Sequence, residues 1–261
     1  MQFDHPPVVT LGISKDGERL ASSSGSPNRV VKVWRLDADP PREESSFQPT
    51  VGRIDYLEFS PEGKTLAIVG RTLELRRVEQ GDLAHSLTFE GLYKVAFSPD
   101  GNLIAAGGGR NVRVWDVTNG QLKWEITAHA LAVNGLAFFP NGRALVTGSS
   151  DRTAKLWEVE SGRLVATLEG LLQGADGVAV SPDGRRVAVG SGEGTVRLWK
   201  VDGPEPHEVA MLRCLGSLAN PIAFLPDGNT IVARSYGGVQ LWHAPSFAEI
   251  GASEQRGPRT R

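Results

Sequence analysis

The sequence contains a single cysteine, Cys214, among its 261 residues. One cysteine cannot form an internal disulfide or supply a zinc site built from several cysteines. The chain also has no Asn-x-Ser/Thr acceptor for N-glycosylation and no apolar run near the ~20 residues that a membrane-spanning helix needs. Its first residues, MQFDHPPVVT, have neither a basic leader nor an apolar segment typical of a signal peptide. Together these absences predict a protein of the reducing cytoplasm.

An excess of basic residues is absent as well. The chain has 28 Lys and Arg against 30 Asp and Glu, which gives a formal net charge of −2. Binding to a phosphate backbone normally requires a basic domain or a basic stripe. We therefore expect neither a nucleic acid nor a membrane among the partners. With 40% hydrophobic residues, the chain is long enough to bury a substantial core.

What the sequence has is a repeat. Residues 98–117 read SPDGNLIAAGGGRNVRVWDV, and residues 181–201 read SPDGRRVAVGSGEGTVRLWKV. Turn glycines preceded by Asp, Asn or Glu recur at spacings of 38 to 46 residues, at Gly17, Gly63, Gly101, Gly142, Gly184 and Gly228. A tryptophan follows in five of these six copies, as Trp34, Trp115, Trp157, Trp199 and Trp242, and Arg76 stands at this position in the second copy. A fixed period of about forty residues indicates a repeat architecture.

Each copy has the pattern of four short strands. The segment VAFSPDGNLIAAGG reads as strand, turn and strand, because Pro fixes φ, Asp accepts local backbone bonds and Gly adopts a positive φ. A β-rich third segment and a fourth one follow after further turns, and no helical periodicity is present. A single such sheet has apolar residues on both faces, so neighbouring copies must stack. We expect an all-β fold, a β-propeller of six four-stranded antiparallel blades.

The repeat resembles the WD-repeat β-propeller family. The segments AHALAVNGLAFFPNG (128–142) and GSSDRTAKLWEV (148–159) match that pattern almost position for position. The resemblance implies a buried polar network in the fourth copy, formed by His129, Thr147 or Ser149, Asp151 and Trp157. Copies two, three, five and six lack the histidine, so we expect their blades to depend on packing more than on polar networks.

The repeat divides the chain into one domain and a short tail. We expect the propeller to span residues 1–253, with a flexible tail at 254–261. The expected repeats cover residues 5–50, 51–89, 90–128, 129–169, 170–213 and 214–253, and residues 247–253 are expected to supply the last outer strand.

Three arrangements of the ring are compatible with this pattern. The ring can be closed with six blades, open with two exposed blade faces, or part of a larger propeller that another chain or a missing segment completes. We expect the closed ring and a monomer, because an open ring leaves apolar faces in water.

Nothing in the sequence predicts a catalytic, metal or cofactor site. The Gly-rich segments at 107–115 and 190–199 lead into strands, whereas a phosphate-binding loop must lead into a helix. The histidines His5, His85, His129, His207 and His243 occupy unrelated repeat positions, so they do not converge on the axis. A propeller hydrolase or lactonase remains the alternative, and its sign would be an axial cluster of groups with perturbed pKa values.

Polar residues recur near the start of the innermost strands. Five residues before the turn serine or its equivalent stand Val9, Asp55, Tyr93, Asn134, Asp176 and Asn220. In the family that the chain resembles, this position and the neighbouring turns lie on the top face and commonly contact peptides or proteins. The candidate binding residues are Arg53, Asp55, Arg71, Tyr93, Arg110, Asn134, Asp176, Asn220 and Tyr236. The alternative is that these side chains only cap turns or hold channel water.

The sequence therefore favours a non-catalytic scaffold of the WD-repeat type that binds a protein or peptide. The alternatives are a propeller enzyme with an axial site and one module of a larger regulatory protein. Neither the identity of the partner nor the pathway follows from the sequence.

The repeat register makes a direct prediction for Trp157. Trp157→Ala removes a large buried aromatic side chain and should lower the free energy of unfolding by roughly 3–5 kcal/mol. Urea melts of the variant and the parent measure this difference. A loss below about 1 kcal/mol, as for an ordinary surface change, contradicts the register.

Overall fold

The computed structural model describes residues 8–25, 29–89 and 91–244. Of Leu92 and Tyr93 it describes the backbone alone. The described residues form 23 strands and no helix. The strands fall into six antiparallel sheets, each formed by strands that follow one another along the chain. Each sheet is a meander, so its order in space is its order in the sequence.

Three blades come from the first half of the chain. The first blade contains β1 (Val8–Ile13), β2 (Arg19–Ser24), β3 (Val31–Arg35) and β4 (Arg42–Phe47). The second blade contains β5 (Tyr56–Phe59), β6 (Thr65–Val69), β7 (Leu73–Arg77) and β8 (Leu83–Leu87). The third blade contains β9 (Leu92–Phe97), β10 (Leu103–Gly108), β11 (Asn111–Asp116) and β12 (Leu122–Thr127).

The second half of the chain forms the other three. The fourth blade contains β13 (Val133–Phe138), β14 (Ala144–Ser149), β15 (Ala154–Glu158) and β16 (Leu164–Leu168). The fifth blade contains β17 (Ala175–Val180), β18 (Arg186–Ser191), β19 (Thr195–Lys200) and β20 (His207–Arg213). The sixth blade contains β21 (Ile222–Phe224), β22 (Thr230–Ser235) and β23 (Gly238–His243).

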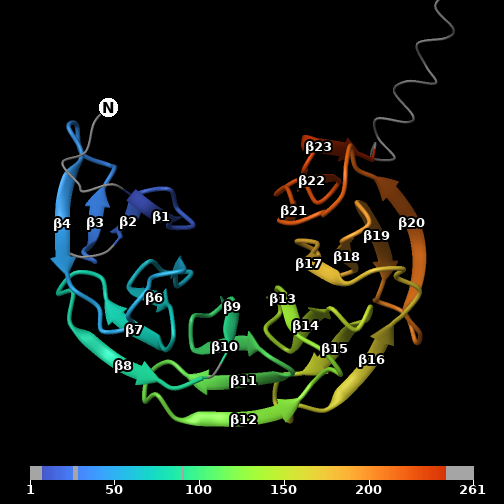
Figure 1. Cartoon of the computed structure of the whole chain (residues 1–261), viewed down its shortest axis with the longest axis horizontal. Helices are drawn as coiled ribbons and strands as arrows, with labels where there is room; N and C mark the ends of the chain where they lie inside the picture. Colours follow the sequence, from blue (N-terminus) through green and yellow to red (C-terminus); the bar gives the residue numbers. More distant parts are fainter. Residues whose placement is uncertain (1–7, 26–28, 90, 245–261) are drawn as a thin grey trace, which may run out of the picture.

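The blades stand around a common axis. The first strand of each blade lies nearest the centre, and the outermost strands β4, β8, β12, β16 and β20 form the rim (Figure 1). This arrangement confirms the predicted all-β propeller. The sixth blade has three described strands, and the predicted outer strand at 247–253 lies outside the described residues, as does the tail at 254–261.

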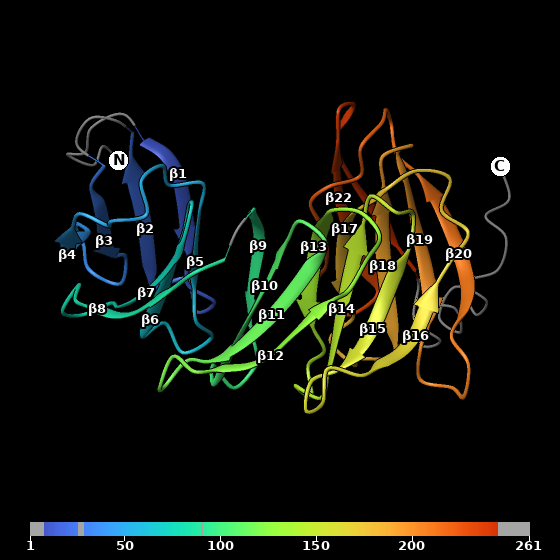
Figure 2. The ribbon, with the colours of Figure 1, turned by 60° about the horizontal axis from the view of Figure 1, so that its bottom comes forward.

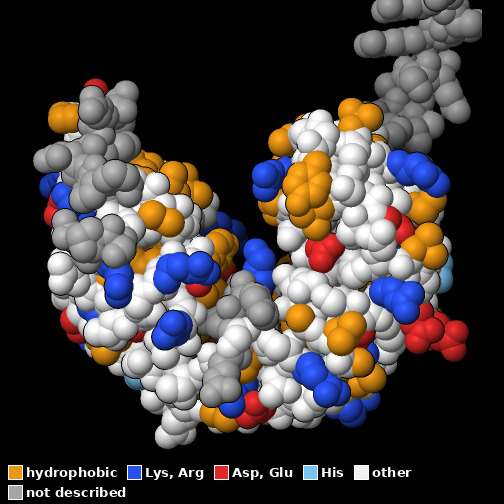
Figure 3. All heavy atoms as spheres, in the orientation of Figure 1, with side chains coloured by type: hydrophobic (Ala, Val, Ile, Leu, Met, Phe, Trp, Pro, Cys, Tyr) orange, Lys and Arg blue, Asp and Glu red, His pale blue; other side chains and the backbone are white. Residues whose placement is uncertain are grey.

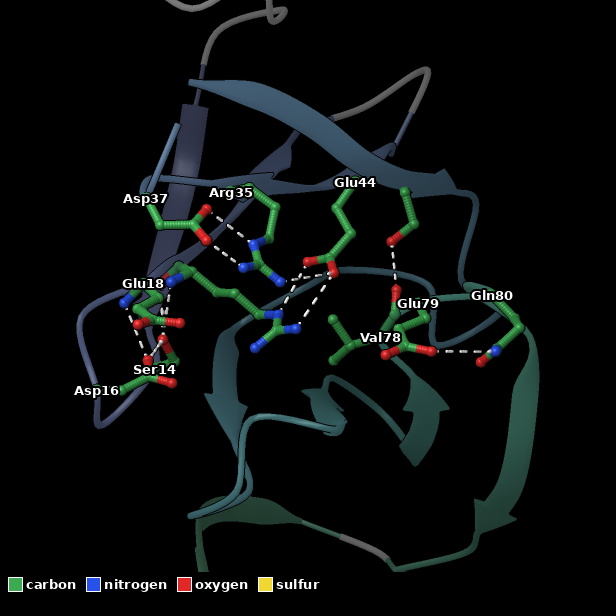
Figure 4. A network of polar contacts seen from close by, with 11 residues as sticks. Ser14, Asp16, Glu18, Arg35, Asp37, Glu44, Val78, Glu79 and Gln80 are labelled. Carbon is green, nitrogen blue, oxygen red and sulfur yellow. Dashed lines mark hydrogen bonds and ion pairs between the residues drawn. The ribbon is translucent and has the colours of Figure 1, made fainter. Parts of the chain in front are cut away.

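The recurring turn between the first and second strands has the chemistry that the sequence predicts. All six turn glycines have a positive φ, between 69° and 76°. In the first blade, Ser14 Oγ donates to Asp16 Oδ1 at 2.5 Å, and that oxygen also accepts the backbone N–H of Glu18 at 2.9 Å (Figure 4). Ser98 and Asp100 repeat the serine–aspartate bond in the third blade at 2.5 Å. These bonds stabilise the carboxylates and lower the pKa of both aspartates.

Five apolar clusters hold the ring together, one between each pair of consecutive blades. The cluster between the first two blades includes Val33 and Leu57, and the one between the third and fourth includes Val114 and Trp157. The remaining three clusters join blades two and three, four and five, and five and six. Polar contacts add to this packing: Ser45 Oγ on β4 donates to the Val78 carbonyl after β7 at 2.6 Å (Figure 4).

The second blade replaces the tryptophan with a buried ion pair. In the fourth blade, Lys155 lies over the Trp157 ring, with its ammonium 5.9 Å from the centroid. The equivalent residues of the second blade are Glu74 and Arg76, whose Oε2 and Nε lie 2.9 Å apart. Glu74 is fully buried and also accepts the backbone N–H of Thr50 at 2.6 Å. In the second blade, the cation Arg76 thus stands at the tryptophan position, and the anion Glu74 stands at the lysine position.

The ring is open in the structure. A gap separates β1 from the sixth blade (Figures 1 and 2), while every other pair of neighbouring blades shares an apolar cluster. None of the five clusters of described residues joins the first blade to the sixth. The expectation of a closed ring is therefore wrong for this structure. The apolar packing that holds every other blade against its neighbour is missing at this junction of the described residues, so no hydrophobic contact there draws the two blades together.

Apolar side chains line both sides of the gap. Gly12 faces the second blade, because a Cβ on it would lie 2.8 Å from the Leu57 carbonyl oxygen. Alternation along the strand therefore turns Leu11 and Ile13 toward the gap, and they are 55% and 64% exposed. Across the gap, Val239 and Leu241 of β23 are similarly exposed. Figure 3 shows hydrophobic side chains over β1 and over the sixth blade on the two sides of this gap.

The open gap can be tested by placing charges on β1. In the open ring, Leu11→Lys with Ile13→Lys should change the free energy of unfolding by less than about 0.5 kcal/mol, because both residues already face water. In a closed ring the lysines would be buried against the sixth blade and cost several kcal/mol. Leu57 occupies the repeat position of Leu11 in the second blade and is 1% exposed, so Leu57→Lys is the matched control that should disrupt folding. Urea melts that show a large loss for the β1 variant contradict the open ring.

Candidate binding site on the upper face

The propeller has two different faces. We call the upper face the one formed by the turns between the second and third strands of each blade and by the connections from one blade to the next. The lower face contains the turns between the first and second strands and between the third and fourth. The view in Figures 1 and 3 looks onto the upper face.

The predicted polar network is present in the fourth blade. Trp157 Nε1 donates to Thr147 Oγ1 at 2.8 Å, and Thr147 Oγ1 lies 2.7 Å from His129 Nε2. His129 Nδ1 lies 2.9 Å from Asp151 Oδ2, which also accepts the backbone N–H of Ala130 at 3.0 Å. Of the two hydroxyl candidates, Thr147 makes the link, whereas Ser149 Oγ donates to the Leu131 carbonyl and accepts the N–H of Asp151.

These contacts give the network a structural role. The ionised Asp151 carboxylate can only accept a hydrogen bond, so the proton of a neutral His129 is on Nδ1. Nε2 therefore accepts a hydrogen bond from the Thr147 hydroxyl, which itself accepts the indole N–H. Nδ1–H then donates to the Asp151 carboxylate, and burial lowers the pKa of His129. The hydrogen bonds of the network hold the pKa of Asp151 at about 2, against the effect of its burial. Both ring nitrogens of His129 are therefore hydrogen-bonded within the fourth blade. These bonds anchor the connection that enters this blade from the third.

Three of the candidate binding residues meet at the channel. Asn134 on β13 donates from Nδ2 to Asp176 Oδ1 on β17 at 3.1 Å, and to Ser150 Oγ at 2.9 Å. A Cβ on Gly177 would lie 3.1 Å from Asn220 Oδ1, so Asn220 lies directly beside β17. Burial raises the pKa of Asp176, although the bond from Asn134 opposes this rise. Side chains of blades four, five and six therefore converge at the mouth of the channel.

The described side chains of the other candidates make no hydrogen bond or ion pair with these three residues. Arg53 Nε pairs with Asp55 Oδ1 at 2.5 Å on the exposed connection into the second blade. Arg71 and Arg110 are exposed in the turns between the second and third strands of their blades, and Tyr236 is 78% exposed in the equivalent turn of the sixth blade. Tyr93 lies on β9, and its side chain is outside the described part of the chain.

The channel contains a cavity of about 300 Å³, and the candidate set omits part of its polar and charged lining. Tyr56, Glu58 and Lys94 line it on one side, and Asp176 and Asn220 on the other. A signal for these residues is present in the sequence. Four and two residues before the turn serine, the last three copies have only Gly, Ala or Pro, whereas copies two and three have Tyr56, Glu58 and Lys94.

Glu58 is the most perturbed carboxyl of the channel. Burial raises its pKa to about 7, although Lys94 and the Tyr56 hydroxyl oppose the rise. Burial also raises the pKa of Tyr56 to about 12. The Lys94 ammonium lies 5.2 Å from the centroid of the Tyr56 ring. An acid, a phenol and an ammonium group thus share the interior of the channel.

The described residues contain neither a membrane-spanning helix nor a cluster of metal ligands. No helix there is long and apolar enough to cross a membrane. Within the same residues, no group of three or more His, Cys, Asp or Glu side chains is placed to hold a metal ion.

The perturbed Glu58 predicts a pH-dependent stability. Between pH 4.5, the ordinary pKa of a glutamate, and pH 7, the pKa of Glu58 in the folded protein, Glu58 is ionised in the unfolded chain but still protonated in the folded one. The free energy of unfolding therefore falls as the pH rises through this range. Glu58→Gln removes this penalty and should raise the free energy of unfolding at pH 8 by about 1–3 kcal/mol, with the gain shrinking toward pH 4.5. The exposed Glu79→Gln is the control and should change little at either pH. Urea melts across this range that show no pH-dependent gain would contradict the burial of Glu58.

Comparison with known proteins is consistent with this architecture. The family model "WD domain, G-beta repeat" matches residues 81–116, 120–158 and 162–200. Each match begins just before the outermost strand of one blade and ends with the third strand of the next. The sequence repeat is therefore offset from the structural blade by one strand.

Similar curated proteins also contain this repeat. An uncharacterized WD repeat-containing protein of Synechocystis is 28% identical over 147 residues, which are 54% of this chain and 41% of the relative. Autophagy-related protein 16 of Arabidopsis thaliana is 23% identical over 54% of this chain and 28% of its own length. The human U5 small nuclear ribonucleoprotein 40 kDa protein is 38% identical over 60 residues, 23% of this chain and 17% of its own.

Each of these alignments spans less than half of the relative's length. They share with this chain the WD repeat, whose propellers generally serve as scaffolds for protein interactions. The matched repeats and the blade architecture together support a WD-repeat family for this chain.

Proposed function

We propose that this protein is a non-catalytic scaffold that binds a protein or peptide on its upper face, around the mouth of the channel. The observation that supports this proposal is the convergence of Asn134, Asp176 and Asn220 from three consecutive blades beside the cavity. A rigid surface with a few convergent polar groups and exposed Arg and Tyr side chains suits the recognition of a peptide.

The partner occupies a surface whose side chains have few structural tasks. Asn134 and Asp176 satisfy each other, and the exposed side chains of Arg71 and Tyr236 can contact a ligand without unfolding a blade. By contrast, the histidine and aspartate of the fourth blade are used in the buried network, so they are not available as a catalytic pair. A cytoplasmic location remains a prediction from the sequence.

A second candidate is an enzyme with an axial site. It is favoured by the channel cluster of Glu58, Lys94 and Tyr56, since perturbed carboxyl groups in a cavity are typical of catalytic acids and bases. Burial alone accounts for the raised pKa of Glu58, and the small neighbours on blades four to six offer no nucleophile. Turnover in an esterase, lactonase or phosphatase screen that Glu58→Gln abolishes would favour this candidate over the scaffold.

The open gap offers a second place for a partner. Leu11 and Ile13 on one side and Val239 and Leu241 on the other leave two apolar blade faces in water. A further blade from another chain or from a further segment of the same protein would cover both faces. Sedimentation distinguishes this arrangement, because a monodisperse monomer at high concentration argues against completion by a second copy.

The upper-face proposal is tested by affinity capture. The purified chain serves as bait, and Asp55, Tyr93 and Asp176 are changed together to Ala. The melting temperature should stay nearly unchanged, because none of the described changes opens a core cluster, and capture of the partner should be lost. A matched variant with Glu79, Glu160 and Glu205 of the lower turns changed to Ala should retain the partner. Undiminished capture by the first variant discards the upper-face assignment.

A further inference from the structure

The repeat places an arginine in the same upper turn of four consecutive blades. The turn between the second and third strands contains Arg29, Arg71, Arg110 and Arg152 in blades one to four, and all four residues are exposed. The same turn contains Glu193 in the fifth blade and Tyr236 in the sixth. These arginines therefore form an arc along one side of the upper face, which we call the arginine arc. Figure 3 shows Lys and Arg side chains on this face over the second blade and beside the channel.

The charge of the arginine arc is not compensated by neighbouring acids. Arg71 and Arg152 form no ion pair with any residue that the structure describes, and Arg110 donates from Nε to the His129 carbonyl at 3.3 Å. The acids nearby are already engaged: Asp55 pairs with Arg53, and Asp151 accepts bonds from His129, Thr153 and Ala130. The arc thus presents guanidinium groups whose charge is available to a ligand.

The lower turns contain more acidic than basic residues. Three lower turns, at 36–41, 78–82 and 201–206, contain acidic residues and no Lys or Arg: Asp37, Asp39, Glu79, Asp82, Asp202 and Glu205. On the upper face itself, Glu169, Asp176 and Glu193 lie after the fourth blade and in the fifth. An anionic segment is therefore attracted to the arc more than to the lower turns or to the acids of the fifth blade, and the part of the partner that contacts Asp176 lies outside this segment.

This charge pattern identifies the chemistry of the partner, an inference that rests on the scaffold function proposed above. We propose that the segment that docks on the upper face is an acidic peptide segment, rich in Asp and Glu, which lies along Arg71, Arg110 and Arg152. Each planar guanidinium group matches a carboxylate with two parallel hydrogen bonds. A nucleic acid fits less well, because the arc is bounded by acids and the chain has a net charge of −2.

The probe is a fluorescent ten-residue peptide of alternating Glu and Asp, and its neutral counterpart contains Gln and Asn. Fluorescence anisotropy with the full chain should show binding of the acidic peptide only, weaker at higher salt because screening shortens the range of the attraction. Changing Arg71, Arg110 and Arg152 together to Gln should weaken binding at least about tenfold at low salt and flatten the salt dependence.

The lower turns provide a matched control. Arg143, Arg163 and Arg185 are equally exposed, and their joint change to Gln alters the net charge by the same amount. This control should change binding less than about twofold, since its arginines lie on the far face. Equal losses in the two variants, or no binding of the acidic peptide, overturn the proposal. Tighter binding of a single-stranded oligonucleotide through the same arginines also overturns it, in favour of a nucleic acid. Circular dichroism melts confirm that both variants are folded.

The capture experiment separates this inference from the function on which it rests. If the captured partner is lost on changing Asp55, Tyr93 and Asp176 but retained on changing the arc, the scaffold function stands and the acidic segment is wrong. If both changes release the partner and the acidic peptide competes for it, both stand. If the acidic peptide binds through the arc while capture depends on neither set, the acidic site stands and the proposed scaffold function fails.

Discussion

The structure depends on the burial of two apolar faces by every blade. A four-stranded sheet of this size cannot hide both faces by itself, so it is stable only between two neighbours. Five apolar clusters meet this requirement for ten of the twelve faces, one cluster for each pair of consecutive blades. The two remaining faces belong to the first and sixth blades, and Leu11, Ile13, Val239 and Leu241 leave them exposed. Within the described residues, the open gap is therefore the one junction where two blades do not bury their apolar faces against each other.

The repeat conserves interactions rather than residue types. In the first and fourth blades, a lysine lies over the tryptophan, and the indole N–H donates to Ser22 or Thr147. The second blade exchanges both residues, so that Arg76 fills the tryptophan position and Glu74 the lysine position. Arg76 also lies over the Phe47 ring at 4.8 Å, so a cation and an aromatic ring still meet there. A change of one residue alone would leave a buried charge without a partner, which explains why the two differ together.

The sequence predicts those features that depend on local chemistry. The Ser–Pro–Asp–Gly turns determine the hairpins, and the spacing of the turn glycines gives six blades. The network around His129 follows from the family pattern, although the choice of Thr147 over Ser149 required the structure. Closure of the ring depends on the sum of small angles between blades, each set by packing across an interface, and no local signal encodes that sum. The bond between Asn134 and Asp176 joins two neighbouring blades at the mouth of the channel, so it cannot be predicted from the sequence of one repeat.

The upper and lower faces of the propeller differ in whether the charged side chains of their turns are needed for folding. On the lower face, Asp16 and Asp100 are bound by serine hydroxyls and backbone N–H groups, so these acids are needed to close their turns. On the upper face, the positive φ that closes the turn is supplied by residues such as Gly109, or by the backbone of Arg152 itself. Of the side chains of Arg71, Arg110 and Arg152, Arg110 alone makes a hydrogen bond to a described residue, the His129 carbonyl. A residue without a structural task can vary without loss of stability, and it can therefore be selected for a ligand. The recurrence of arginine in four consecutive upper turns, where the fold requires only a tight turn, is thus better explained by binding than by folding.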